Sequence, residues 1–185
     1  SQDQSVADMV AIMDACGLAA AVIGGHSLGG CASLAFHLAH PQRTAGLMLF
    51  DTDPGFKKDE ARAGWNTRAN ARADQFDAQG LEALSNSPGT RSAGHRNATG
   101  LARAARGMLA QFDDSLIQSL PNIAVPTMVL VGDGDEPFHA GTCYMAKNIP
   151  NVQKVVIKNS NHVAKEDQPV AFNNAVLGFL GELSF

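Results

Sequence analysis

Three short apolar runs and a fourth predicted strand, separated by segments with helical spacing, set the pattern of this chain. The apolar runs cover residues 19–23, 46–50 and 127–132, the fourth predicted strand covers residues 152–157, and the first run is too uniformly apolar for a surface strand. Helical periodicity covers residues 5–16, 31–39, 141–147 and 168–180, with Ser5 as a candidate N-cap and Gly17 as a stop. This alternation predicts an α/β fold, a parallel sheet of about four strands with helices on both faces.

Residues 57–120 follow a different pattern, because alanine and arginine dominate and no strand signal occurs. We therefore divide the chain into an α/β core, residues 1–56 and 121–185, and a helical cap insert. The insert carries Arg62, Arg68, Arg72, Arg91, Arg96, Arg103 and Arg106. Their placement favours solvated helix faces, and the alternative is a lid whose cations meet an acidic substrate. Trp65 and Met108 are candidate substrate-binding residues, although their helical spacing also fits core packing.

Composition and charge narrow the class of protein. The chain has 185 residues, of which 45% are hydrophobic and 17% charged, as in ordinary soluble domains. A formal net charge of −4 with dispersed cations argues against a nucleic-acid partner. The three cysteines lack CxxC spacing, which favours reduced thiols over disulfides or zinc. No apolar run reaches the ~18 to 20 residues of a membrane helix, and no signal peptide is recognisable, so we expect a cytoplasmic protein without a membrane partner.

A glycine-rich turn directly after the first apolar run carries the strongest chemical signal. Residues 25–29 read Gly-His-Ser-Leu-Gly and match G-x-S-x-G between a predicted strand and a predicted helix. Such a turn needs small residues beside the central position and holds the Ser27 hydroxyl at a helix N-terminus. The alternatives are an N-capping serine and a phosphate-binding loop. The sequence does not match a dinucleotide-binding fingerprint, because Ser27 stands where the second glycine should be. It does not match a nucleotide-binding P-loop either, because no GK[ST] sequence follows.

A nucleophilic serine needs a histidine base and a carboxylate that orients the histidine. Among six histidines, His162 is the candidate base, because it follows the fourth predicted strand in a polar loop before the last helix. Asp135, after the third run, is the favoured acid in the order Ser, Asp, His. The competing carboxylates at the same edge are Asp133, Glu136, Asp51 and Asp53. His26 and Asp51 are also candidate substrate-binding residues.

Taken together, these segments resemble the α/β-hydrolase family. The resemblance rests on GHSLGG at 25–30, VPTMVLVGDGDEP at 125–137, SNHVAKEDQP at 160–169 and DTDPG at 51–55, and it covers nearly the whole chain. It implies Ser27 as nucleophile, Asp135 as acid, His162 as base and the Leu28 N–H as an oxyanion donor. It further implies a serine hydrolase of the carboxylesterase or lactonase kind, which acts on a small ester without a metal or cofactor. Aspartate-dependent dehalogenases and epoxide hydrolases are disfavoured by the serine.

The chain departs from this family at its N-terminus, because the strands that usually precede residue 5 are missing. Strand 19–23 would then lie at an open sheet edge, which invites pairing with another chain. The missing region normally supplies a second oxyanion donor, whose loss lowers turnover by about 10² to 10³. We expect either a piece of a longer protein or a minimal hydrolase that forms a homo-oligomer through this edge. The alternatives are a non-catalytic small-molecule binder, and perhydrolysis or carbon–carbon bond hydrolysis on the same residues.

Overall fold

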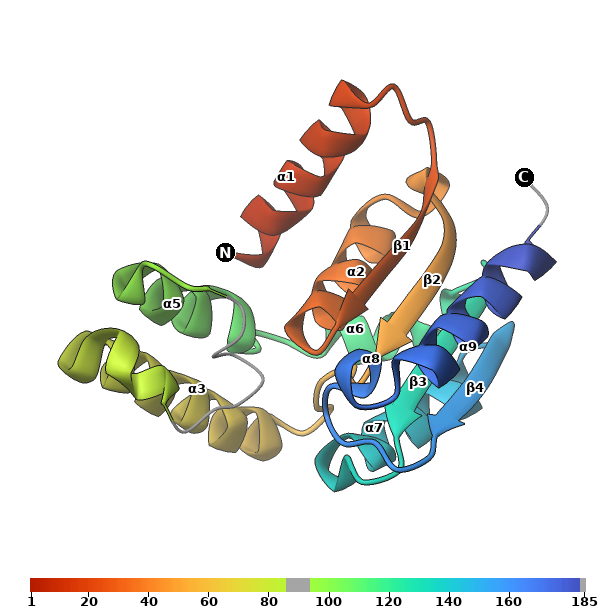
Figure 1. Cartoon of the computed structure of the whole chain (residues 1–185). Helices are drawn as coiled ribbons and strands as arrows, with labels where there is room; N and C mark the ends of the chain where they lie inside the picture. Colours follow the sequence, from red (N-terminus) through yellow and green to blue (C-terminus); the bar gives the residue numbers. More distant parts are fainter. Residues whose placement is uncertain (86–93, 184–185) are drawn as a thin grey trace. The chain divides into compact units, whose positions relative to one another are not determined.

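A computed structural model describes residues 1–85 and 94–183 of the chain (Figure 1). Its contacts divide the chain into two compact units. The larger unit contains residues 3–55 and 115–185 and holds the sheet, and the smaller contains residues 1–2 and 56–114 and is helical. Residues 115–120, which we placed with the insert, thus group with the sheet. Residues 86–93 of the predicted insert, which include Arg91, lie outside the described residues.

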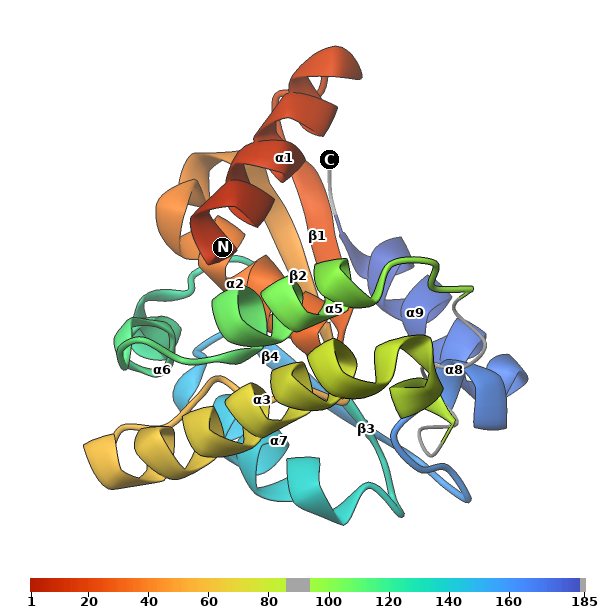
Figure 2. The same ribbon diagram turned by 90° about the vertical axis from the view of Figure 1, so that its left-hand side faces the viewer.

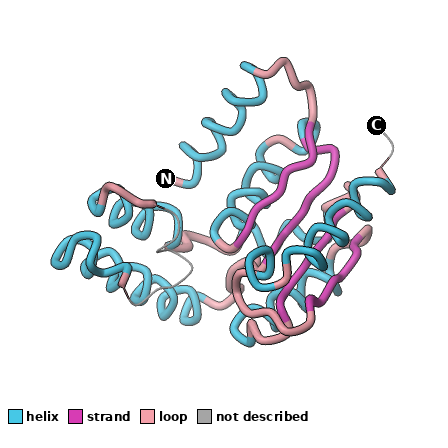
Figure 3. The backbone as a smooth tube through the Cα atoms, viewed as in Figure 1, coloured by secondary structure: helices cyan, strands magenta, loops and turns pink. Residues whose placement is uncertain are grey.

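The larger unit contains a four-stranded parallel sheet in the order β1-β2-β3-β4, which confirms the predicted fold class (Figure 3). The strands are β1 (Ala21–His26), β2 (Thr44–Phe50), β3 (Thr127–Gly132) and β4 (Val152–Ile157). Because all four run in one direction, their carboxyl ends meet at a single edge of the sheet. The loops after residues 26, 50, 132 and 157 therefore converge there.

Helices cover both faces of this sheet (Figure 2). One face packs against α1 (Gln2–Ala15), α2 (Leu28–Ala39), α6 (Ser115–Ser119) and α7 (Glu136–Asn148). The opposite face packs against α8 (Ala164–Asp167) and α9 (Pro169–Glu182). Short 3-10 turns, η1 (Pro41–Arg43) and η4 (Leu120–Asn122), lead into β2 and the segment before β3. Both faces of the central strands are thus withdrawn from water, as parallel sheets require.

Alternation along the central strands explains how both faces are filled. In β2, Leu47 and Leu49 enter the core with Leu34 and Phe36 of α2, and all four side chains are fully buried. In β3, residue 129 packs into that same core, whereas the next residue, Leu130, packs on the opposite face. Successive residues of a strand point to opposite faces, so a uniformly apolar run is what a doubly covered strand needs.

The structure corrects several of the predicted boundaries. Helix α1 begins at Gln2, so Ser5 lies inside it and is not its N-cap. Helix α7 begins at residue 136, five residues before the predicted start. Strand β1 covers residues 21–26 rather than 19–23, and only Ile23 within it is buried. Its burial on both faces was a wrong prediction, because β1 is the outer strand of the described sheet and pairs only with β2.

The smaller unit is built from helices that pack through small side chains. It contains α3 (Asp59–Gln79), η2 (Gly80–Leu84), α5 (Ala98–Ala104) and a π-helical turn η3 (Ala105–Leu109). Ala73 and Phe76 of α3 form its core with Ala102 and Ala105. Helix α3 ends where Gly80 takes a φ of 64°, a conformation that glycine adopts without steric cost. No helix in the described part of the chain is long and apolar enough to cross a membrane.

Candidate active site

Ser27 stands at a sharp turn between β1 and α2, as the G-x-S-x-G pattern predicts. Its backbone has φ 54° and ψ −118°, a conformation that non-glycine residues rarely adopt. The Ser27 N–H donates to the carbonyl of Phe50, and its own carbonyl accepts from the hydroxyl of Thr52 at 2.7 Å. Both partners lie at the end of β2. The neighbouring strand therefore holds the turn in its strained conformation.

Two glycines of this turn are needed for steric reasons. A Cβ on Gly25 would lie 2.2 Å from the backbone of Gly29, and a Cβ on Gly30 would lie 2.5 Å from the side chain of Thr52. By contrast, a Cβ on Gly29 would meet nothing within 4 Å. The predicted need for a small residue thus holds at position 25 but not at position 29, where only the backbone approaches its neighbour.

The first turn of α2 presents main-chain N–H groups next to Ser27. The N–H groups of Gly30 and Cys31 donate to the Ser27 carbonyl at 2.9 and 3.4 Å. Leu28 and Gly29 are the first residues of α2, where amides have no acceptor within their own helix. A helix N-terminus with such amides favours a developing negative charge. The role of the Leu28 N–H as an oxyanion donor stays a prediction.

Three side chains from separate loops come together at the carboxyl edge of the sheet. The Nε2 atom of His162 lies 3.0 Å from the Oγ of Ser27, and its Nδ1 lies 2.9 Å from the Oδ2 of Asp135. A carboxylate only accepts hydrogen bonds, so Nδ1 carries the proton in this pair. Nε2 of the neutral ring then has a free electron pair directed at the serine hydroxyl. The predicted nucleophile, base and acid thus form one hydrogen-bonded row.

Asp135 occupies the N-cap position of α7, yet its side chain makes no capping hydrogen bond. Its carboxylate turns instead to His162 and is 4% exposed. The competing carboxylate of Asp133 accepts from the backbone of Ser160 and lies 3.8 Å from the Lys158 ammonium. Among the aspartates that follow β3, the structure therefore brings Asp135 to the histidine.

The loops that carry Asp135 and His162 contact each other backbone to backbone. The Gly134 N–H donates to the carbonyl of Ser160 at 2.8 Å. A Cβ on Gly132 would lie 2.3 Å from the carbonyl of Asn161. The Asn161 N–H in turn donates to the carboxylate of Asp167 at 2.7 Å. This close packing sets the distance between acid and base before any substrate is bound.

Sequence reasoning missed one ring at this site. The side chain of Phe138, in the first turn of α7, stacks on the His162 imidazole with ring centroids 4.6 Å apart and planes 24° apart. The available signal was an aromatic residue three positions after the candidate acid, within an otherwise polar loop.

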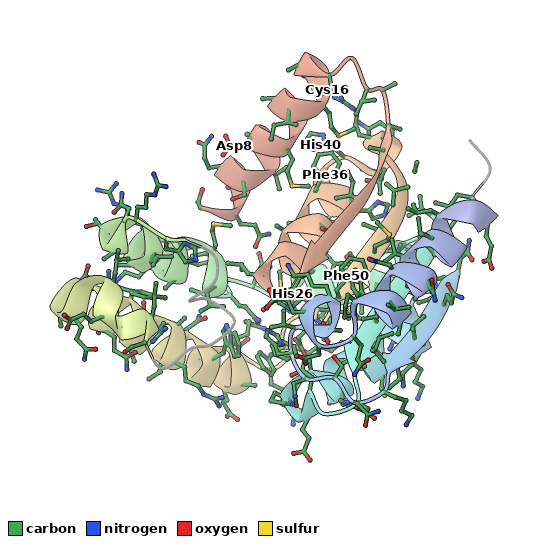
Figure 4. The ribbon with its side chains drawn as sticks, in the orientation of Figure 1. Asp8, Cys16, His26, Phe36, His40 and Phe50 are labelled. Carbon is green, nitrogen blue, oxygen red and sulfur yellow. The ribbon has the colours of Figure 1, made fainter. Side chains whose placement is uncertain are left out.

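His26 and Asp51 lie next to the three-residue row. Figure 4 shows His26 and Phe50 at the carboxyl ends of β1 and β2, where the two residues are register partners. Nε2 of His26 donates to the main-chain carbonyl of His162 at 2.5 Å, and the two imidazole centroids are 4.9 Å apart. The Asp51 Oδ2 lies 4.0 Å from the same His26 nitrogen. The Asp51 Oδ1 accepts from the Gly132 N–H at 2.9 Å.

Burial changes the protonation of both residues. Asp51 is 1% exposed, and desolvation raises its pKa to about 6 against the opposing hydrogen bond from Gly132. Desolvation lowers the pKa of His26, so its ring is neutral at neutral pH. Because the Asp51 carboxylate is enclosed and already bonded to the backbone, the structure gives it a partner within the protein. Its predicted contact with substrate, like that of His26, stays a prediction.

Trp65 and Met108 belong to the helical unit. The Trp65 indole N–H donates to the carbonyl of Leu109 at 2.7 Å, and its ring lies 6.0 Å from that of Phe56. Met108 lies in the π-helical turn η3. The Trp65 indole thus takes part in the packing of its own unit, as the alternative interpretation expects. The role of both residues in binding substrate, and of residues 57–120 as a cap, stays a prediction.

The described residues contain no group of three or more histidine, cysteine, aspartate or glutamate side chains arranged to hold a metal ion. The free thiol of Cys31, on α2, donates to the main-chain carbonyl of Asp53 at 3.2 Å. Burial raises the pKa of this thiol, which disfavours the reactive thiolate. Cys31 therefore serves in packing beneath the turn.

Comparisons with known proteins place these features in context. Over 199 residues, 29% are identical to a Bacillus subtilis (strain 168) protein named as a 2-succinyl-6-hydroxy-2,4-cyclohexadiene-1-carboxylate synthase, covering 97% of this chain and 73% of that one. MenH from S. aureus superposes with a TM-score of 0.86 at 24% identity, covering 98% and 76% of the two chains. A thermophilic esterase from Thermogutta terrifontis superposes with a TM-score of 0.83 at 26% identity, covering 97% and 72%. Residues 2–175 match the description "Alpha/beta hydrolase family", and the chain belongs to that family.

Proposed function

We propose that this protein is a serine hydrolase that cleaves a carboxylic ester or lactone of a small acyl substrate. The observation that carries the proposal is the row in which His162 lies 3.0 Å from the Ser27 hydroxyl and 2.9 Å from the Asp135 carboxylate. A serine becomes a nucleophile when a base accepts its proton, and this geometry provides one. The family of the chain and its 26% identity to an esterase support the same class of reaction.

The proposed reaction uses these atoms in the following steps. Ser27 Oγ attacks the carbonyl carbon while its proton passes to Nε2 of His162, and the buried Asp135 carboxylate stabilises the resulting imidazolium. The Leu28 N–H steadies the oxyanion at the start of α2. His162 then returns the proton to the leaving alcohol, which leaves an acyl group on Ser27. Water, activated by the same imidazole, releases the acid and restores the serine.

The experiment that tests this proposal is hydrolysis of p-nitrophenyl acetate by wild type and by Ser27→Ala, with a fluorophosphonate probe for labelling. We expect the variant to lose at least about 10³-fold in kcat and all labelling. Ser5→Ala, inside α1, is the matched control and should behave as wild type. Folded wild-type protein that neither turns over nor labels would support the non-catalytic binder instead.

A second candidate function has its own observation. The Bacillus subtilis relative is named as a synthase of a cyclohexadiene carboxylate, and MenH superposes with a TM-score of 0.86. The same serine–histidine row can move a proton in an elimination without forming an acyl-enzyme. The two candidate functions are distinguished by supplying the precursor used by that synthase and measuring the absorbance of the diene product. Diene formation without ester turnover would favour the synthase reaction.

We also propose that the chain self-associates through β1. This strand pairs only with β2 within the described sheet, so one row of its backbone groups has no partner strand there. Unpaired edges of this kind favour pairing with a second chain. Light scattering after size-exclusion chromatography tests the proposal, and a monodisperse monomer across micromolar concentrations would refute it.

A further inference from the structure

Two further contacts connect the strand ends next to the row of Ser27, His162 and Asp135. Neither contact is part of the proposed chemical steps. At the end of β1, the ring of His26 donates to the main-chain carbonyl of His162. At the end of β2, the carboxylate of Asp51 accepts from the Gly132 N–H, three residues before Asp135. One contact therefore fixes the segment that carries the base, and the other fixes the segment that carries the acid.

The state of the His26 ring follows from its partner. A carbonyl oxygen can only accept, so Nε2 of His26 must carry a proton in this contact. The ring is neutral at neutral pH, since desolvation lowers its pKa, and its only proton is therefore on Nε2. The buried Asp51 Oδ2, 4.0 Å from the same nitrogen, favours that tautomer electrostatically. The fold thus fixes both the place and the tautomer of a ring that is 25% exposed.

The bond from His26 fixes the main chain at the residue whose side chain must reach Ser27. His162 lies between Asn161 and Val163, in a segment outside the regular strands and helices. Nε2 of His162 must stay within about 3 Å of the serine hydroxyl, and an error of about 1 Å at such a distance can cost about 10²-fold in rate. A donor on the adjacent strand end restrains this segment directly.

Building on the proposed function, we infer that His26 is a positioning residue, whose ring N–H holds the main chain of His162 so that the imidazole stays between Ser27 and Asp135. The role needs a donor at the place of Nε2 rather than an aromatic ring. It also needs no contact with substrate. This separates it from the predicted substrate-binding role, which would alter KM.

Two variants separate the donor from the ring. His26→Phe keeps a ring and removes the donor, whereas His26→Gln keeps an N–H at a similar reach and removes the ring. We expect His26→Phe to lower kcat for p-nitrophenyl acetate by about 10- to 100-fold with KM within twofold. His26→Gln should recover most of that loss. Fluorophosphonate titration gives the fraction of reactive Ser27, so misfolded protein is not counted as slow enzyme.

The matched control is His40, a half-buried histidine at the end of α2 whose ring lies 5.5 Å from that of Phe36. His40→Phe and His40→Gln make the same exchanges away from the site, and both should keep kcat within about twofold of wild type. A parallel loss of kcat in the His40 variants would show that any histidine exchange disturbs the fold, which would overturn the inference.

A readout that does not need turnover completes the test. Nitrogen-15 NMR of the histidine rings, recorded through their carbon-bound protons, reports the tautomer of each ring. In wild type we expect His26 protonated on Nε2 and His162 on Nδ1, and in His26→Phe a mixture of tautomers at His162. Wild type without Ser27-dependent turnover would refute the proposed function, and the NMR result would still decide on positioning. Unchanged kcat and an unchanged His162 tautomer in His26→Phe would refute positioning alone.

Discussion

The carboxylate of Asp135 lies 2.9 Å from Nδ1 of His162, although it stands at a helix N-cap position where aspartate ordinarily binds the helix's own amides. Helix α7 therefore begins without that stabilising contact. The Asp135 carboxylate instead contacts an imidazole 27 positions away in the sequence. A residue that gives up a common local bond for a distant one indicates a function for the distant partner.

Asp135→Asn tests that interpretation. The amide keeps the size of the side chain but no longer neutralises an imidazolium, and it can present a donor to Nδ1, which favours the wrong tautomer. We expect kcat for p-nitrophenyl acetate to fall by about 10³- to 10⁴-fold with little change in KM. Asp133→Asn is the control and should lose less than about tenfold. A larger loss of kcat in Asp133→Asn than in Asp135→Asn would indicate that Asp133 is the acid.

Gly25→Ala should prevent stable folding. The added Cβ would lie 2.2 Å from the backbone of Gly29, which cannot move without breaking the turn. We expect the free energy of unfolding, measured with urea, to fall by more than about 3 kcal/mol. Gly29→Ala is the matched exchange, and its Cβ meets nothing within 4 Å. It should change stability by less than about 1 kcal/mol, and equal losses in the two variants would contradict the steric account.

Ser27→Gly should be more stable than Ser27→Ala, although both lack the nucleophile. The φ of 54° strains any residue with a Cβ, and such strain costs on the order of 1–3 kcal/mol. Glycine relieves it and loses only about 0.5–1 kcal/mol through its more flexible unfolded chain. Thermal and urea unfolding should therefore place Ser27→Gly about 1 kcal/mol above Ser27→Ala. The reverse order would mean that the turn is not strained.

Asp51 predicts how stability depends on pH. Burial raises its pKa from an ordinary 3.8 to about 6, so between these values the folded protein binds a proton that the unfolded chain releases. The contribution of Asp51 to the free energy of unfolding is largest below pH 3.8 and is lost as the pH rises through about 6. The total change is on the order of 3 kcal/mol.

Asp51→Asn should remove this dependence, because its side chain does not ionise and its oxygen can still accept from Gly132. At pH 8 the variant should be at least as stable as wild type. Urea unfolding from pH 4 to pH 8 measures the difference, with Asp8→Asn on the exposed face of α1 as the control. If Asp51→Asn were less stable than wild type at pH 8, burial of the ionised Asp51 carboxylate would not destabilise the fold, which would contradict this prediction.

Local pattern was enough to predict much of this molecule. The uniform apolarity of residues 127–132 predicted β3 at its observed bounds, because a strand covered on both faces needs side chains of that kind. Strand β4 was also predicted at its observed bounds, residues 152–157. The G-x-S-x-G spacing predicted the turn at Ser27, since its backbone conformation tolerates only certain residues. Chain order then brought Asp135 and His162 to the same edge, because parallel strands end together.

Contacts between distant segments settled the rest. No local signal indicates that Asp51 is enclosed or that His26 bonds to a carbonyl 136 positions away, and the position of Phe138 after the candidate acid did not specify its stacking on His162. Strand β1 was predicted as doubly buried from composition alone, whereas its exposure depends on which strands lie beside it. Propensity acts between neighbours in sequence, but burial, ring stacking and the partner of a hydrogen bond are decided only when separate elements pack together.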